Sequence, residues 1–208
     1  MPFEHTFVSI PEILEEAKDG KMFILVDDED RENEGDLIVI AEHATPEKIN
    51  FMTKYARGLI CLAIHSSIAQ RLELKLHKRI NIKESDTAFT YSIDAKDGIT
   101  TGISAYDRAK TIAVAINKNS SIKDIQIPGH IFPVLANDNG VLSRKGHTEA
   151  VVDIARIIRA IPAAVICEIM NDDGTMARKD DLIKFANKYN LKIADINSLL
   201  RYRIENAL

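Results

Sequence analysis

The chain has 208 residues, of which 46% are hydrophobic and 28% charged, and its formal net charge is −4. This size and balance are typical of one globular domain, so we expect a single domain over residues 1–208. The net charge excludes a general basic surface for nucleic acid, and no apolar run reaches the roughly 18–20 residues that a membrane span needs. The N-terminus lacks a signal-peptide pattern. Cys61 and Cys167 lie far apart in apolar runs, so we expect both to be reduced core residues of a cytoplasmic protein.

Local signals in the first half of the chain predict alternating helices and strands. Ser9 and Glu12 can form a capping box, and Gly20 stands where the helix that they begin would end. Thr45 and Pro46 form an N-cap and first helical position. The expected helices cover residues 9–20, 45–58 and about 67–72, the expected strands cover 22–27, 37–41, 59–64 and 88–94, and residues 73–86 are expected to form a loop.

The second half continues the alternation. We expect helices over residues 104–117, 148–161, 179–189 and from 197 onward, strands over 131–136, 162–170 and 191–195, and turns at 137–140 and 171–174. Residues 118–130 read as a connection, and Pro133 indicates an edge strand or a bulge. Buried strands that alternate with helices predict a layered α/β domain, and the hairpin-like connections predict a mixed sheet.

The segment DDEDRENEGD (27–36) places seven acids and one cation, Arg31, between two apolar strands. A charge run is often only a solvated loop. The alternative is a ligand site at the rim of the sheet, because crowded carboxylates need a cation and hard oxygen ligands suit Mg²⁺ or Mn²⁺. A calcium loop does not fit, since Ala41 occupies the twelfth position, where a glutamate is required.

The segment SRKGHTEA (143–150) gathers polar groups just before a helix. It could be merely a capped helix start with surface charges. The functional interpretation is a phosphate site, in which the helix N-terminus, Arg144 and Thr148 offer donors. His147 offers an imidazole to a metal or a proton, and Lys145 is either a second phosphate contact or solvated.

Two further residues stand out in apolar surroundings. Glu168 interrupts AAVICEIM, so it is either paired structurally or suited to acid/base chemistry. His130 lies in PGHIF at the mouth of a strand, where a satisfied, partly buried histidine is the simpler interpretation.

The motifs DDEDRENEGD, TAFTYSIDA, TTGISAYDRAKTI, PGHIFPVLA, GVLSRKGHTEAVVDIAR and AAVICEIMNDDGTMAR occur together in this order. In this respect the chain resembles the 3,4-dihydroxy-2-butanone 4-phosphate synthases of riboflavin biosynthesis. The resemblance extends from about residue 9 to residue 203. Several motifs of nine or more residues in one order are far more specific than a short pattern.

The resemblance implies a lyase that converts D-ribulose 5-phosphate to L-3,4-dihydroxy-2-butanone 4-phosphate and formate with Mg²⁺. Mn²⁺ stays the alternative ion, because the same oxygen ligands suit it. It implies a single-domain three-layer α/β/α sandwich around a mixed β-sheet, and a cytoplasmic homodimer with active sites near the subunit interface. It implies neither a nucleic acid nor a membrane as partner.

The resemblance also assigns roles to residues. The implied metal ligands are Glu32 and His147, and the implied catalytic acid/base pair is His130 and Glu168. Glu34 is a candidate further base, and Asp107 is expected nearby. The implied substrate contacts are Arg31, Glu32, Asp36, Arg144, Lys145, Gly146, His147, Thr148 and Glu168.

Three positions depart from the family pattern: His65, where we expect Thr; Asp86, where Gly is usual; and Lys145, where a small residue is usual. Two rival interpretations also remain. One is another Mg²⁺-dependent enzyme of sugar phosphates, such as an isomerase or aldolase, which would release no formate. The other is a non-catalytic metal- or nucleotide-binding module, which would consume no ribulose 5-phosphate.

Overall fold

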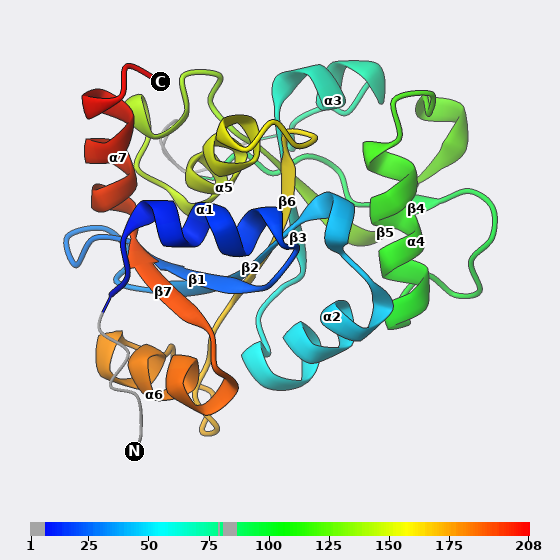
Figure 1. Ribbon diagram of the computed structural model, residues 1–208. Coiled ribbons are helices and arrows are strands. Elements are labelled where there is room, and N and C mark those ends of the chain that lie inside the picture. The colour runs from blue at the N-terminus through cyan, green and yellow to red at the C-terminus, as the bar shows by residue number, and fades with distance from the viewer. Residues whose placement is uncertain (1–6, 79, 81–86) are drawn as a thin grey trace.

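A computed structural model describes residues 7–78, 80 and 87–208. Asp86 and residues 81–85 of the expected loop therefore lie outside the described residues. A seven-stranded sheet forms the centre of the molecule, in the order β4-β5-β3-β6-β2-β1-β7 (Figure 1). The strands are β1 (Phe23–Val26), β2 (Gly35–Ile40), β3 (Cys61–Ile64), β4 (Ile93–Ala95), β5 (Ile125–Leu135), β6 (Ala163–Glu168) and β7 (Lys192–Asp195).

The sheet is mixed, as predicted. Strand β1 pairs in parallel with β7, and β3 pairs in parallel with β5. The other ladders, β1–β2, β2–β6, β3–β6 and β4–β5, are antiparallel. Every residue of β1, β2 and β3 is buried, which explains why these strands read as continuous apolar runs.

Helices cover both faces of the sheet and complete a three-layer α/β/α sandwich. They are α1 (Ile10–Lys18), α2 (Pro46–Phe51), α3 (Ser66–Arg71), α4 (Ala105–Ile116), α5 (His147–Ile157), α6 (Lys179–Tyr189) and α7 (Ile196–Glu205). Helices α1, α5 and α7 cover one face of the sheet, and α2, α4 and α6 cover the other (Figure 1). Their apolar side chains belong to two separate core clusters, one for each set of helices. No helix of the described residues combines the length and the apolar character of a membrane span.

The helix signals are confirmed in their details. The Ser9 backbone N–H donates to Glu12 Oε2 over 3.0 Å, and the Ser9 hydroxyl lies 2.8 Å from the same oxygen. The helix expected over 45–58 consists of α2 followed by a π-helical turn, η2 (Met52–Ala56). It ends at Arg57, whose φ of 71° is left-handed. Shorter 3₁₀ segments are η1 (Ala41–His43), η3 (Ile122–Asp124) and η4 (Gly140–Leu142).

Two strand predictions are wrong in part. Strand β5 begins at Ile125, within the expected connection 118–130. The sequence did not indicate this first part of the strand, because residues 126–128 are exposed and lack the alternation of a half-buried strand. The strand expected over 88–94 is reduced to β4 and isolated bridges at Phe89 and Thr90. Strand β5 lies inside the sheet, so Pro133 does not mark an edge. The bulge alternative is not observed at Pro133 either, which pairs in regular register with Leu62. The register shift of β5 lies earlier, between Gln126 and Ile131, where it pairs with β4.

Candidate active site

One cavity of about 310 Å³ collects most of the polar residues that the sequence singles out. We call it the carboxylate cavity. Its walls come from the loop between β1 and β2, the start of β2, the end of β6, the start of α5 and the segment 87–89. The lining residues are Arg31, Glu32, Glu34, Asp36, Cys61, Thr87, Phe89, Val134, His147, Thr148, Ile166 and Glu168.

The loop over residues 27–34, which we call the acidic loop, is organised by Asp27. Strands β1 and β2 are antiparallel neighbours, and the Asp27 N–H donates to the Glu34 carbonyl over 3.1 Å. The Asp27 carboxylate accepts from the backbone N–H of Glu34 at 2.9 Å and of Glu32 at 3.3 Å. It also accepts from Arg31 Nη1 at 2.5 Å, and its side chain is 0% exposed. The Asp27 carboxylate therefore accepts hydrogen bonds from two backbone N–H groups and one guanidinium of the loop.

Asp27, Glu32 and His147 each place one ligand atom within 4.8 Å of the others. Two carboxylates and one imidazole suit Mg²⁺ or Mn²⁺. The structure thus brings together the two metal ligands expected from the sequence, Glu32 and His147, and adds Asp27. Sequence reasoning missed Asp27 among seven acids; its position directly after the buried strand β1 was the available signal.

His147 is the first residue of α5 and is buried. Its Nε2 lies 3.2 Å from the Leu25 carbonyl oxygen, so this nitrogen must carry the hydrogen and donate it. Burial lowers the pKa of His147, which favours the neutral imidazole. Nδ1 then keeps its lone pair, as a metal ligand must.

Three carboxyl groups face the cavity beside the candidate metal ligands. Asp36 begins the ladder between β2 and β6, directly opposite Glu168. Burial, and next the charge of Glu168, raise the pKa of Asp36 well above its ordinary value. Burial and the charge of Glu32 also raise the pKa of Glu34. Glu168 is held in place by the Leu59 N–H, which donates to its Oε2 over 2.8 Å. Both shifts favour the protonated carboxyl relative to an exposed one.

The segment before α5 is arranged around a buried acid. Arg144 Nη1 donates to Glu149 Oε2 over 2.6 Å, and Nη2 donates to the Thr87 hydroxyl over 3.2 Å. Because Thr87 lines the carboxylate cavity, Arg144 lies at its rim. A Cβ on Gly146 would lie 2.1 Å from Arg144 Nη1, so a side chain there would displace the guanidinium. Thr148 lines the cavity, whereas Lys145 is exposed.

His130 does not line the carboxylate cavity, so one chain does not bring it together with Glu168. It lies on β5, where its Nδ1 is 2.7 Å from Asp94 Oδ2 and its backbone N–H donates to Asp94 Oδ1 over 2.9 Å. Its side chain is 42% exposed. The Asp94 carboxylate fixes the orientation of the imidazole and leaves one of its edges open to the surroundings.

Asp107 binds a turn that lies beside His130. Its carboxylate accepts from the Thr100 hydroxyl at 2.7 Å and from the Gly102 N–H at 3.1 Å, and these bonds lower its pKa. Gly102 has a φ of +93°, and a Cβ there would lie 2.3 Å from Asp94 Oδ2 and 2.5 Å from His130 Nδ1. Asp107 therefore helps to hold a glycine turn against the Asp94–His130 pair.

Two other residues of interest have local explanations. His65 is the N-cap of α3, where its Nδ1 accepts from the Ser67 N–H over 3.2 Å, so this departure from the family pattern serves a helix start. Cys61 and Cys167 are free and buried, as expected. Cys61 also lines the carboxylate cavity, and burial raises the pKa of its thiol.

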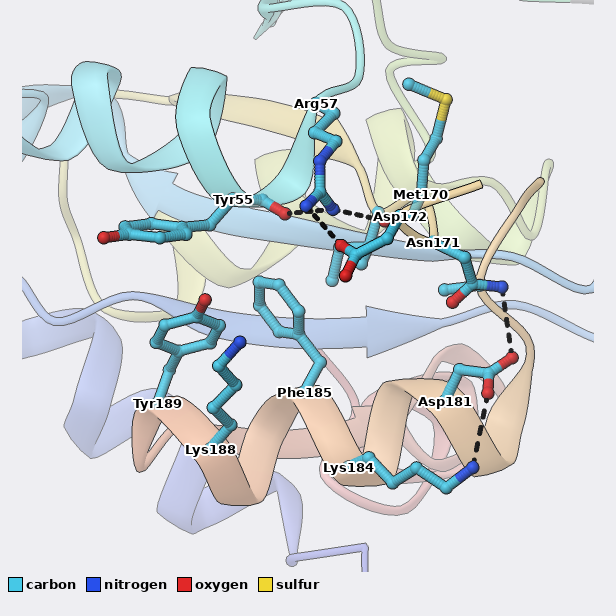
Figure 2. A pocket seen from close by; sticks show the side chains of 12 residues that line it. Tyr55, Arg57, Met170, Asn171, Asp172, Asp181, Lys184, Phe185, Lys188 and Tyr189 are labelled. Carbon is cyan, nitrogen blue, oxygen red and sulfur yellow. Dashed lines mark hydrogen bonds and ion pairs between the residues drawn. The ribbon is translucent and has the colours of Figure 1, made fainter. Parts of the chain in front are cut away.

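A second cavity, of about 270 Å³, lies between η2 and α6 (Figure 2). Tyr55, Phe185 and Tyr189 form its aromatic part, and Arg57 spans its other end toward Asp172. None of the site residues expected from the sequence lines it.

Several known proteins are similar to this chain. Residues 11–202 match the family model of 3,4-dihydroxy-2-butanone 4-phosphate synthase. The chain is 54% identical over 203 residues to the riboflavin biosynthesis protein RibBA of Aquifex aeolicus, which covers 97% of this chain and 50% of that protein. It is 55% identical over 194 residues to 3,4-dihydroxy-2-butanone 4-phosphate synthase of Neisseria meningitidis, which covers 93% of this chain and 53% of the relative. The chain thus spans about half the length of the curated relatives it matches.

Solved structures agree with the observed fold. The crystal structure of RibBX, a two-domain 3,4-dihydroxy-2-butanone 4-phosphate synthase from A. baumannii, matches with a TM-score of 0.90 at 48% identity, over 94% of this chain and 58% of that one. A 3,4-dihydroxy-2-butanone 4-phosphate synthase in complex with two magnesium ions matches with a TM-score of 0.88 at 35% identity, over 94% of this chain and 96% of that one. The family model, the identities and the fold agree: the chain belongs to the 3,4-dihydroxy-2-butanone 4-phosphate synthase family.

Proposed function

We propose that the chain is a lyase that converts D-ribulose 5-phosphate to L-3,4-dihydroxy-2-butanone 4-phosphate and formate, a step of riboflavin biosynthesis. The observation that supports this most directly is the carboxylate cavity. In a chain of this family, it combines the candidate metal ligands Glu32 and His147 with the candidate proton-transfer group Glu168 and with Asp36.

Asp27, Glu32 and His147 would hold a divalent cation, Mg²⁺ or alternatively Mn²⁺. Their oxygen and imidazole donors fit either ion. A family member whose structure is described with two magnesium ions supports this assignment. When bound, the ion supplies positive charge that stabilises negative charge on substrate oxygens. Arg31 donates to both Asp27 and Glu32, so it keeps these carboxylates facing one another at the cavity.

The reaction needs groups that accept and donate protons. Removal of the proton at C3 gives an enediol, and the C1 hydroxyl leaves as water. The carbon skeleton then rearranges, and a water adds to the C4 carbonyl before C4 leaves as formate. We assign these proton transfers to Glu168 and His130, with Glu34 as a further base. Asp36, whose raised pKa favours the protonated carboxyl, would donate a hydrogen bond to a substrate oxygen.

The phosphate of the substrate would bind at the start of α5. Backbone N–H groups at a helix N-terminus attract an anion, and Thr148 adds a hydroxyl inside the cavity. Arg144, oriented by Glu149, would contact the phosphate from the rim. Gly146 lets that guanidinium lie close to the backbone, and the exposed Lys145 is a second cation for the phosphate. Binding the unreactive phosphate orients the carbons that react.

We further propose a cytoplasmic homodimer, in which residues 1–208 of each subunit form one domain. Large apolar side chains are exposed in segments that adjoin His130 or the Gly102 turn beside it: Ile103 by 54%, Tyr106 by 71% and Ile127 by 43%. Exposed apolar groups gathered on one face are typical of a protein interface. A second copy on this face would bring His130 of one subunit toward the carboxylate cavity of the other.

The direct test is incubation of the folded protein with ribulose 5-phosphate and Mg²⁺, with formate followed by proton NMR. We expect formate to appear, and we expect EDTA to stop its formation. Consumption of the substrate without formate would favour an isomerase or aldolase, and no consumption by folded, Mg²⁺-loaded protein would favour a non-catalytic metal-binding module.

A further inference from the structure

Arg178 connects the acidic loop to a distant part of the chain. It is the residue immediately before α6, and it follows the hairpin that continues from β6. Its Nη1 donates to the backbone carbonyl of Glu32 over 2.6 Å and also to the carbonyl of Asn33. One guanidinium nitrogen thus binds two successive carbonyls of the loop that contains a candidate metal ligand.

The hairpin beneath Arg178 is itself firmly held. The Ala177 N–H donates to the Ile169 carbonyl over 3.0 Å, and the Asn171 N–H donates to the Thr175 carbonyl over 2.8 Å. On one side, Arg57 reaches across to the Met170 carbonyl over 3.1 Å (Figure 2).

On the other side of the hairpin, the Asp181 carboxylate accepts from the backbone N–H of Arg178 over 3.3 Å, and the Asn171 amide points at the same carboxylate (Figure 2). Strand β6 ends at Glu168, just before this hairpin. Arg178 therefore follows a hydrogen-bonded hairpin that continues directly from the strand that positions Glu168.

The loop contacted by Arg178 is held from two sides. At its turn, Asn33 has a φ of 54°, a left-handed conformation that asparagine adopts more readily than most residues other than glycine. Asp27 fixes the loop from inside through the N–H groups of Glu32 and Glu34. Arg178 fixes it from outside through the carbonyls at Glu32 and Asn33. The peptide units around Glu32 are therefore held from both sides.

We propose that Arg178 is a positioning residue for the metal centre: it holds the backbone of Glu32 so that the Glu32 carboxylate stays within reach of Asp27 and His147. This role rests on the proposed function, because it concerns the same metal site. Arg178 is not among the residues that line the carboxylate cavity, so it would act through the backbone of Glu32. If it only joined the loop to α6, its loss would lower stability and leave the affinity for metal unchanged.

Electrostatics alone predicts that removing Arg178 raises the affinity for metal, whereas the positioning role predicts that it lowers this affinity. Removing a cation near a cation-binding site strengthens the attraction between the site and a divalent ion. A loss of metal affinity on removing Arg178 would therefore come from misplacement of a ligand. Lys179 provides the matched control, because it is the adjacent cation, lies over the Phe7 ring at 5.5 Å and faces a cavity lined by Asp27 and Asp28.

The experiment measures Mn²⁺ binding to metal-free protein by EPR of the free ion, with circular dichroism as the check of folding. For Arg178→Ala, and for Arg178→Met, which keeps the aliphatic stem, we expect about 10- to 100-fold weaker binding than wild type, the usual effect of losing a group that orients metal ligands. Arg178→Lys, which keeps a donor, should recover part of this loss. Lys179→Ala should bind as tightly as wild type or more tightly.

The outcomes separate this inference from the proposed function. Wild-type affinity in both Arg178→Ala and Arg178→Met would overturn the positioning role while leaving the metal centre intact. Equal losses in Arg178→Met and Lys179→Ala would overturn it as well. No Mn²⁺ binding by the wild-type protein would overturn the metal centre itself, and the role of Arg178 with it.

Discussion

Asp27 illustrates what a single carboxylate does within a crowded acidic loop. It accepts hydrogen bonds from two loop amides and from Arg31, and it still places an oxygen near Glu32 and His147. Sequence reasoning did not distinguish it from its neighbours, because seven acids lie in ten positions and only its place directly after an apolar strand sets it apart. Only the turn of the β1–β2 hairpin points Asp27 inward, while Glu29 and Asp30 remain exposed.

The first prediction separates Asp27 from its neighbour. Asp27→Asn should weaken Mn²⁺ binding by about tenfold or more, because a neutral amide replaces a charged ligand. Asp28→Asn is the matched control: Asp28 accepts from Asn197 on α7 and is not part of the ligand group. Isothermal titration calorimetry with Mn²⁺ measures the affinity of both variants. Equal affinities in the two variants would mean that Asp27 only shapes the loop.

The second prediction concerns pH and Asp36. Because its pKa is raised in the folded state, its contribution to stability is fully present below the ordinary carboxyl pKa of 3.8 and is lost as pH rises through the folded pKa. Asp36→Asn cannot ionise. In metal-free protein it should therefore be more stable than wild type at about pH 8 and similar to it at about pH 4. Urea unfolding at both pH values tests this, and a difference independent of pH would contradict it.

At the scale of elements, the strongest local signals were the best predictors. Capping residues located α1 and α2, and the buried apolar runs located β1, β3 and β6. The first half of β5 was missed because its side chains are exposed and its hydrogen bonds go to the short strand β4. Pairing with a distant partner leaves no trace in local sequence, and the same holds for the contact of Gly102 with His130.

The third prediction tests that contact. Gly102→Ala should lower the rate of formate release by about tenfold or more, because it displaces the Asp94–His130 pair, and acid/base groups typically contribute about 10²–10⁴-fold. Its Mn²⁺ affinity should stay normal. Gly174→Ala is the control, since Gly174 also has a positive φ, +86°, but open space at its Cβ. Equal rates of formate release in the two variants would show that His130 has no part in the mechanism or that Gly102 does not position it.

At the scale of the whole molecule, the mixed sheet and its two helical layers place the carboxylate cavity and His130 at separate positions of one chain. The resemblance of motifs identified both groups as functional. The residues alone also marked the acidic loop, the segment before α5 and Glu168. Neither source could place His130 relative to the cavity, because local sequence patterns carry no information on the distance between segments far apart in the chain; the second copy proposed above is one way to bring the two together.

The fourth prediction therefore tests assembly. Tyr106→Asp puts a charge into the exposed apolar face and should convert a dimer to monomers that stay folded and bind Mn²⁺ but release little formate. Ile204→Asp, at a 63% exposed position on α7, should remain dimeric and active. Light scattering with size-exclusion chromatography measures the mass. A monomeric wild type, or a fully active Tyr106→Asp monomer, would contradict the dimer.

The most direct test of the central claim uses ribulose 5-phosphate labelled with ¹³C at C4. The chain is proposed to expel that carbon, after the skeletal rearrangement, with Mg²⁺ bound by Asp27, Glu32 and His147. With Mg²⁺ present, ¹³C NMR should show the label in formate, in an amount equal to the substrate consumed. Label that stays in a phosphorylated product, or unlabelled formate, would contradict the account.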